Sequence, residues 1–192
     1  MKLLAYVVFS VTCLVSSQIF AQAKDFEGLT VDLSAVSSNA TAKGDGKYKG
    51  NTVLPTLGLG YAKAISEQAT IGVTATYDLD KTKSGTVSPG YNIQGKNHYS
   101  VNLQPGYAIS KELLVYGTLG VHQMTISVTG SNTLGSKTFT GYGYGLGARF
   151  AVSKELYLKV EAQQVDFQKE RYAGSDVKAT STLATVGIGY KF

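Results

Sequence analysis

Two neighbouring polar residues, His98 and Ser100, are the best candidates for chemistry in this sequence. They are two positions apart, so a β-strand would place both side chains on one face. Asp78 or Asp80 lies at the end of the preceding predicted strand, which would be the neighbour of the strand that carries them. A serine that a histidine activates, with a carboxylate to orient the histidine, is a nucleophile. The sequence therefore offers one candidate hydrolase site.

The other candidate residues predict no cofactor. His122 is expected inside the fold as a hydrogen-bonded residue, and two histidines that are separated in the sequence do not make a metal site. No helical pattern follows the glycines between Gly141 and Gly147, so they are interpreted as strand packing rather than as a phosphate-binding loop. We accordingly predict no metal, no cofactor and no catalytic residue, and we keep the hydrolase as an alternative.

Basic residues gather in the predicted long connections between strands. They could bind the phosphates of lipopolysaccharide or an acidic host glycan, or they could be ordinary solubility charge, which the many Gly, Ser, Thr and Asn residues around them favour. The whole chain has a net charge of +5, which is too mild and too evenly spread to predict nucleic-acid binding. The residues concerned are Lys43, Lys47, Lys49, Lys81, Lys83, Lys96, Lys169, Arg171 and Lys178.

The first 23 residues predict a secretory signal peptide. Lys2 precedes an apolar run from Leu3 to about Val15, and a small-residue ending, Ala-Gln-Ala, predicts cleavage after Ala23. The only cysteine, Cys13, lies inside this segment. Residues 24–192 therefore form one domain without a disulfide and without thiol chemistry.

A short phrase that recurs along the chain divides the domain into hairpins. It reads Y-A-K-A-I-S-E, Y-A-I-S-K-E and F-A-V-S-K-E, with its serine at positions 66, 110 and 153, about 43 residues apart. Each period has room for two strands, one short turn and one longer loop, and four periods predict eight strands. The predicted strands are Phe26–Val36, Thr52–Ala62, Ala69–Asp80, His98–Ala108, Leu113–Ser127, Phe139–Phe150, Leu156–Phe167 and Thr180–Phe192. The predicted long loops are Ser37–Asn51, Lys81–Asn97, Val128–Thr138 and Gln168–Ala179.

Within each predicted strand, apolar residues alternate with small polar ones. Val73, Leu103 and Val186 belong to the apolar face, whereas Thr74 and Asn102 belong to the other face. A face exposed to water would carry many Lys and Glu residues, but the polar face is mostly Thr, Ser, Asn and Gly. Such residues suit the crowded interior of an eight-stranded barrel, which side chains just fill. The sequence thus predicts a closed barrel with its apolar face outward; a soluble lipocalin-like barrel or a β-sandwich is the alternative.

Two details of the interior remain open in the sequence. The alternation slips near Gln123 to Ile126 and at Val165 and Phe167, which bulges, or strand ends above a membrane, would explain. The few inward charges, among them Arg149, Lys159 and Glu161, could form an ion network. Alternatively, Arg149 and Lys191 could lie at the wet rim beside the short turns. Tyr157, Lys159, Glu161 and Gln163 should face the row of glycines at 141–147 on the hairpin partner.

Aromatic residues occur on the apolar face at matching strand ends, as the interfacial girdles of a membrane barrel require. One set is Tyr61, Tyr107, Phe150, Tyr190 and Phe192, and a second set is Tyr77, Tyr99 and Tyr142 or Tyr144. Together with the alternation and the turn rhythm, the final Phe192 resembles the small eight-stranded outer-membrane barrels of the OmpA/OmpX type and, more loosely, the opacity-type surface antigens. The resemblance implies that the strand ending at Phe192 is the signal for the barrel-assembly machinery.

The sequence and this resemblance together predict an all-β fold, an eight-stranded antiparallel up-and-down transmembrane β-barrel with short periplasmic turns and long extracellular loops. The expected protein is a monomer of the Gram-negative outer membrane with both termini in the periplasm. Its expected role is structural or surface-interactive, in contact with outer-membrane lipid, lipopolysaccharide or a host surface. A narrow porin is one alternative. A lipid A-modifying hydrolase is the other, because His98-Tyr99-Ser100 is similar to a string in lipid A deacylase barrels; however, both side chains should face the interior, away from lipid.

Overall fold

The computed structural model describes residues 23–43, 47–88, 91–129, 136–172 and 175–192. A short 3-10 helix precedes ten strands, and the described residues contain no helix long and apolar enough to span a membrane. The elements are η1 (Ala23–Phe26), β1 (Gly28–Lys43), β2 (Lys47–Ala64), β3 (Ala69–Asp78), β4 (Thr82–Ser88), β5 (Tyr91–Ala108), β6 (Leu113–Thr129), β7 (Ser136–Ala151), β8 (Leu156–Phe167), β9 (Glu170–Tyr172) and β10 (Ser175–Lys191).

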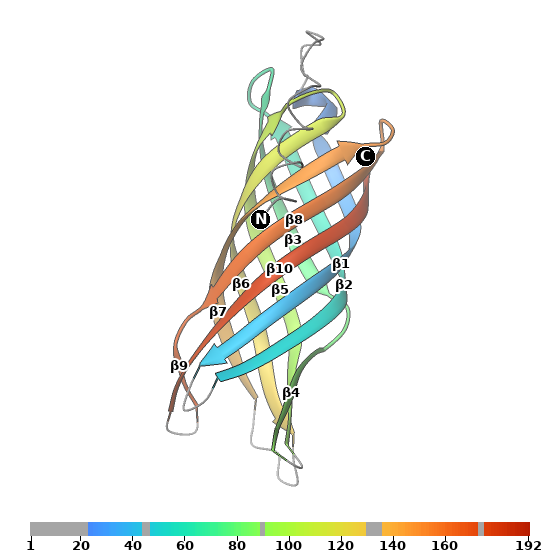
Figure 1. Cartoon of the computed structure of the whole chain (residues 1–192). Coiled ribbons are helices and arrows are strands. Elements are labelled where there is room, and N and C mark those ends of the chain that lie inside the picture. Colours follow the sequence, from blue (N-terminus) through green and yellow to red (C-terminus); the bar gives the residue numbers. More distant parts are fainter. Residues whose placement is uncertain (1–22, 44–46, 89–90, 130–135, 173–174) are drawn as a thin grey trace, which may run out of the picture.

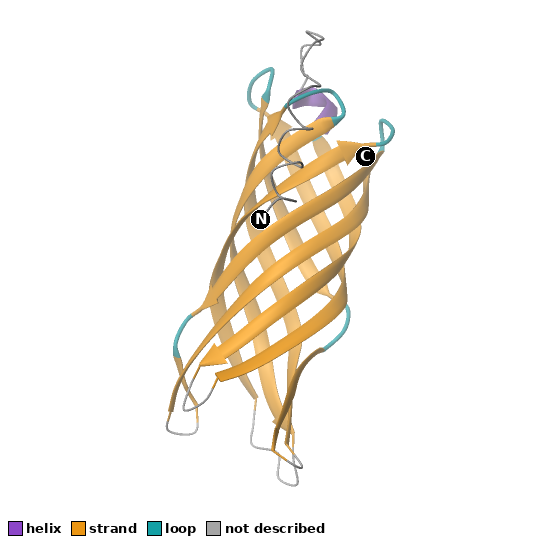
Figure 2. Cartoon of the chain, in the orientation of Figure 1, coloured by secondary structure: helices purple, strands orange, loops and turns teal. Residues whose placement is uncertain are grey.

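Eight of these strands form a closed antiparallel barrel, which confirms the predicted fold (Figure 1). The order around the wall is β1-β2-β3-β5-β6-β7-β8-β10, and pairing of β1 with β10 closes it. The two remaining strands extend the wall beyond the barrel, β4 against β5 and β9 against β10. Figure 2 shows the short turns and η1 at one end of the barrel, and Figure 1 shows β4 and β9 at the other. We call these the turn end and the loop end.

The three predicted short turns are confirmed, and the serine of the repeated phrase explains them. Ser66, Ser110 and Ser153 each accept a hydrogen bond from the backbone amide three residues later, at 3.0, 3.1 and 3.0 Å. This side-chain contact stabilises a tight reversal. The recurrence of the phrase therefore follows from one turn geometry used three times.

The predicted long loops are largely strand, which corrects the sequence analysis. β1 continues to Lys43 and β2 begins at Lys47, so most of the segment expected as the loop Ser37–Asn51 is a hairpin. β4 and β9 lie inside two other predicted loops. These segments are polar on both faces and thus resemble loops in sequence, but pairing of neighbouring strands satisfies their backbone groups.

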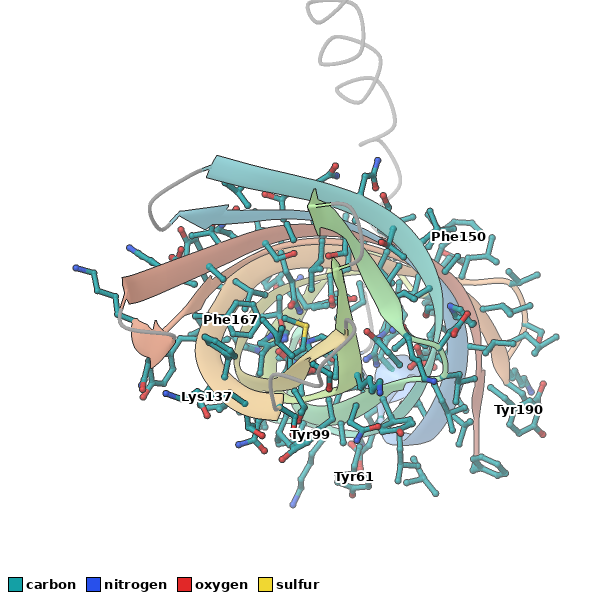
Figure 3. All side chains as sticks on the ribbon, turned by 90° about the horizontal axis from the view of Figure 1, so that it is seen from below. Tyr61, Tyr99, Lys137, Phe150, Phe167 and Tyr190 are labelled. Atoms are coloured by element: carbon teal, nitrogen blue, oxygen red, sulfur yellow. The ribbon has the colours of Figure 1, made fainter. Side chains whose placement is uncertain are left out.

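The side chains face as the alternation predicts. Val73 is 50% exposed on the outer face, whereas Thr74 is 2% exposed inside the barrel. Leu103 and Val186 are also exposed, and Asn102 and Thr185 are buried. Figure 3, seen from the loop end, shows Tyr61, Phe150 and Tyr190 outside the wall, while Phe167 lies toward the lumen. The apolar face therefore forms an outer band, and the polar face fills the interior.

The apparent slips in alternation at the loop end are a change of environment, not bulges in the strands that carry them. β6 pairs with β7, and β8 with β7, without a shift of register. Val165 and Phe167 simply continue the inward series of β8, and they pack in a buried loop-end cluster with Met124 and Ile126 against it. The loop-end cluster is Val36, Phe139, Val165, Phe167 and Leu183. A register shift does occur nearby, but on β5 between Lys96 and Tyr99, where Asn97 has a φ of 52°.

β8 shows how abruptly the environment changes. Its outward residues turn from apolar to polar between Ala162 and Gln164, and its inward residues turn from polar to apolar between Gln163 and Val165. Beyond this level, β8 carries apolar residues on its inner face and polar residues on its outer face, as a strand of a water-exposed barrel does. At the other end, η1 closes the barrel: Phe26 is buried in a turn-end cluster with Ala23, Ala108, Leu114 and Tyr116.

Glycines make room for the large interior side chains. Tyr116 lies over Gly147 of β7, and His122 lies over Gly143 of the same strand. This confirms that the β7 glycine row makes space for large interior side chains. Two of the four β8 residues face the row as predicted, Glu161 opposite Gly147 and Gln163 opposite Gly145. The other two do not, because Tyr157 lies over Gly189 of β10 and Lys159 is opposite Arg149.

Candidate functional site

His98 lies inside the barrel near the loop end, and both of its ring nitrogens have partners. Nδ1 is 2.8 Å from Oδ2 of Asp78, which accepts its hydrogen bond. Nε2 is 3.2 Å from Nδ1 of His122, and the two rings stack with centroids 5.4 Å apart. Asp78 also accepts a 2.6 Å hydrogen bond from Thr56. The structure thus builds an Asp–His–His chain, and the two histidines that are separated in the sequence are in contact.

Ser100, the expected nucleophile of the alternative hydrolase, belongs to a different set of hydrogen bonds. Its Oγ is 2.7 Å from Oγ1 of Thr76 and accepts a 2.7 Å hydrogen bond from Asn102. Since His98 Nε2 is directed at His122, its lone pair is not available to remove the serine proton. The other candidate carboxylate, Asp80, is exposed and caps the amide of Lys81 at 2.7 Å. The catalytic arrangement of Ser100, His98 and a carboxylate that the sequence suggests is therefore not assembled.

The interior charges below the histidines have hydrogen-bond partners, and one pair is ionic, so the first of the two sequence alternatives holds in part. Lys159 forms an ion pair with Asp32, and both are buried. Arg149 is 5% exposed and donates a 2.8 Å hydrogen bond to Gln104, which itself donates to Glu161 at 3.3 Å. Lys191, in contrast, is at the turn end, where its Nζ donates to the backbone oxygen of Asp25 at 2.5 Å.

Arg149 is also held by two aromatic rings. Its guanidinium carbon is 5.3 Å from the ring centroids of both Tyr116 and Tyr157, a separation typical of cation–π contacts.

The sequence analysis does not predict Asp32 as the partner of Lys159. The available signal was that Asp32 is the acidic residue among Thr30, Ser34 and the other small polar residues of the first strand.

The cavities beside the described interior residues are small. A cavity of about 30 Å³ lies beside His98, Ser100 and Glu161, and a second of about 20 Å³ lies at the turn end beside Phe26 and Arg149. Each can hold about one water molecule. Within the described residues, no three His, Cys, Asp or Glu side chains are grouped to hold a metal ion. The arrangement stabilises a filled barrel, with apolar clusters at both ends of a polar middle.

The loop end places basic residues side by side. Lys43 of β1 is the register partner of both Lys47 of β2 and Lys178 of β10, so the three positions form one row across three neighbouring strands. Lys49 lies two positions further along β2, opposite Thr41. Each of the three register positions therefore carries a basic residue. We call Lys43, Lys47 and Lys178 the lysine row.

Comparison with known proteins agrees with this architecture. A 22 kDa outer membrane protein of Rhizobium leguminosarum bv. viciae is 31% identical over 120 residues, which are 60% of this chain and 54% of that protein. The chain thus spans about half the length of this relative.

Two solved barrels are similar in fold. Ail, the attachment invasion locus protein of Yersinia pestis, has a TM-score of 0.58 at 19% identity, over 86% of this chain and 99% of that one. Ail has also been solved in complex with the heparin analogue sucrose octasulfate, with a TM-score of 0.56 at 20% identity, over 86% and 99% of the two chains. Neisserial surface protein A has a TM-score of 0.58 at 18% identity, over 86% and 100%.

The model of the outer membrane protein beta-barrel domain matches residues 7–192, nearly the whole chain. The apolar outer band is therefore the part of the wall that faces hydrocarbon. The chain belongs to the family of outer membrane protein beta-barrel domains and is a β-barrel protein of the outer membrane.

Proposed function

We propose that this barrel is a surface-contact protein whose loop end binds the phosphate groups of lipopolysaccharide. The observation that carries the proposal is the lysine row, three basic positions aligned across β2, β1 and β10. An unscreened row of like charges is unfavourable. A phosphate between them converts repulsion into charge-assisted hydrogen bonds.

We further propose how the barrel is oriented in the outer membrane. The turn end and both chain termini lie on the periplasmic side, and the loop end lies outside the cell. Long connections outside and short turns in the periplasm are the usual arrangement of such barrels. Lipopolysaccharide is then the nearest polyanion to the lysine row. The lysine row favours binding over solubility charge, because register aligns residues that lie apart in the sequence.

The two alternative functions have less support. A hydrolase would need Ser100 to be activated, and its Oγ instead contacts Thr76 and Asn102. A porin would need a water path, whereas the cavities beside the described interior residues hold about one water each. We therefore propose a monomeric barrel that neither catalyses nor conducts.

We also propose that the assembly machinery recognises the end of β10. Phe192 is 71% exposed and meets Tyr190 edge to face at 4.9 Å between centroids. This pair presents an aromatic surface on the outside of the wall, next to the seam between β10 and β1. Deleting Phe192 should lower the amount of folded barrel in cells, while in vitro refolding of the purified chain should change little.

Binding to purified lipopolysaccharide tests the main proposal. In the triple variant Lys43→Ser, Lys47→Ser, Lys178→Ser, affinity should fall at least about tenfold, corresponding to about 1.4 kcal/mol. Binding by the wild type should weaken as salt rises, since exposed charges are screened. Dephosphorylated lipopolysaccharide should bind the wild type no more tightly than it binds the lysine-row triple variant.

The chain offers a matched control. Lys63, Lys111 and Lys154 are exposed at the turn end, and changing all three to serine alters the net charge by the same amount. This control should bind lipopolysaccharide as the wild type does. Equal losses in both triple variants would show that only net charge matters, and unchanged binding in the lysine-row variant would refute the proposal. Sucrose octasulfate, which Ail is known to bind, is a useful second ligand for comparing phosphate with sulfate.

A further inference from the structure

The outer band contains a groove that an extended lipid chain would fit. Its volume is about 680 Å³, and it is open on the side that faces away from the wall. Pro105, Gly117 and Ala162 are among the residues that line it, and Leu119, Tyr144 and Leu146 project around it. Leu146 is 73% exposed and is the register partner of Gly117, so a ridge stands directly beside a notch.

Gly117 creates the notch. A Cβ atom placed on this glycine would have one neighbour within 4 Å, Cγ of Pro105 at 3.8 Å. The other outward residues of β6 around it, Val115 and Leu119, are large. In contrast to Gly143 and Gly147, which face occupied space inside the barrel, Gly117 faces open space on the wall. The hollow is therefore not required for interior packing.

The groove rises across the band rather than encircling the barrel. At its β5 end, Pro105 is two residues from the turn-end aromatic Tyr107. On β8, Ala162 is six residues from Leu156, the first residue of that strand, and the groove ends on β10 at Thr182. From β5 to β10 it crosses four strand spacings, about 19 Å at about 4.8 Å each. A chain in the groove would begin near the turn-side part of the band and end at its loop-side edge.

Two hydrogen-bonding side chains, Gln164 and Thr182, lie at the loop-side edge of the groove. Thr182 donates a 2.8 Å hydrogen bond to Oε1 of Gln164, and both residues line the groove. This bond fixes the amide of Gln164 so that its NH2 group can donate to an ester carbonyl or a phosphate oxygen. A site that is apolar along its length and ends in a fixed donor at the interface matches a lipid, with the acyl chain below and the polar group above.

We propose that this groove binds one acyl chain of lipopolysaccharide, with Gln164 and Thr182 contacting its polar part. The groove is continuous with the hydrocarbon-facing band, so lipid is the molecule that meets it. Lipopolysaccharide rather than phospholipid follows from the orientation proposed above, because the polar edge of the groove is on the loop-end side. Little hydrophobic driving force exists within a bilayer, so close packing against Gly117 and the hydrogen bonds must provide the preference.

Lipid retention tests the proposal. The barrel is placed in nanodiscs containing deep-rough lipopolysaccharide and phosphatidylethanolamine, released into detergent, and analysed by native mass spectrometry. Gly117→Leu fills the notch without meeting the interior and should lower retained lipopolysaccharide about tenfold, corresponding to about 1.4 kcal/mol. Ala75→Leu, an outward substitution on β3 away from the groove, is the control and should retain as much as the wild type.

Three results would overturn the proposal. The first is equal retention of lipopolysaccharide by the wild type and Gly117→Leu. The second is retention of phosphatidylethanolamine in place of lipopolysaccharide. The third is a dimer of barrels that Gly117→Leu dissociates, because the groove would then be an interface between two copies. The lysine-row variant distinguishes this proposal from the previous one. If it retains lipid as the wild type does while Gly117→Leu does not, the groove binds independently of the lysines.

Discussion

Replacing Gly147 by alanine should destabilise the barrel, because the added methyl group has no space. A Cβ atom at this position would lie 2.5 Å from the hydroxyl oxygen of Tyr116 and 2.8 Å from its Cε2. Carbon atoms pack at about 3.5–4.0 Å, so the ring must move by about 1 Å. Tyr116 is 4% exposed and has Arg149 over its ring, so it cannot move freely. We expect a loss of about 2–3 kcal/mol, the upper part of the range for an overpacked core.

The measurement is urea unfolding of the refolded barrel, followed by gel mobility of unheated samples because the chain has no tryptophan for fluorescence. Gly117→Ala is the matched control: it makes the same chemical change in the same hairpin, with open space around the new methyl group. It should change the free energy of unfolding by less than about 0.5 kcal/mol.

A double-mutant cycle identifies the cause. If the clash with Tyr116 is responsible, Gly147→Ala should cost much less in a Tyr116→Leu background, giving a coupling energy of about 1–2 kcal/mol. Strict additivity of the two substitutions would refute this explanation. So would an equal loss in Gly147→Ala and Gly117→Ala, because that result would trace the effect to the backbone of any glycine.

Three further predictions concern the interior. Lys159→Met should cost about 3–5 kcal/mol in the same unfolding assay, since Asp32 is left buried without its cation, and adding Asp32→Asn should restore most of the loss. Ser100→Ala should leave the lipid A of expressing cells unchanged by mass spectrometry, whereas a difference from wild type would revive the hydrolase. In planar bilayers the wild type should show no steady open level, because its described interior cavities hold about one water each; regular conductance steps would contradict this.

Much of the wall could be predicted from sequence because two different environments act on alternate residues. Hydrocarbon selects Val73 and Leu103 for the outside, and a crowded interior selects Thr74 and Asn102. The serines at 66, 110 and 153 then locate the tight turns. The hairpins beyond the band could not be predicted in the same way, since both of their faces are polar and only the pairing of strands reveals them.

The interior contacts were predictable in kind but not in detail. Alternation places His98 and His122 inside, yet only the register of β5 with β6, shifted at Asn97, brings their rings together. The pairing of Lys159 with Asp32 joins β8 to β1 across the lumen. Such contacts depend on how the closed barrel aligns distant strands, which local spacing does not contain.

The reversal of polarity along β8 connects these observations to function. Of the two explanations for Val165 and Phe167, bulges or strand ends above the membrane, the structure supports the second. The outward residues of β8 turn polar between Ala162 and Gln164, and the strand continues beyond the hydrocarbon-facing band. The level of this change is also where the lipid groove ends, at Gln164 and Thr182. The lysine row lies further along the same sheet. A lipid anchored at this level by its acyl chain would therefore present its phosphates toward the side of the wall on which the lysines are aligned.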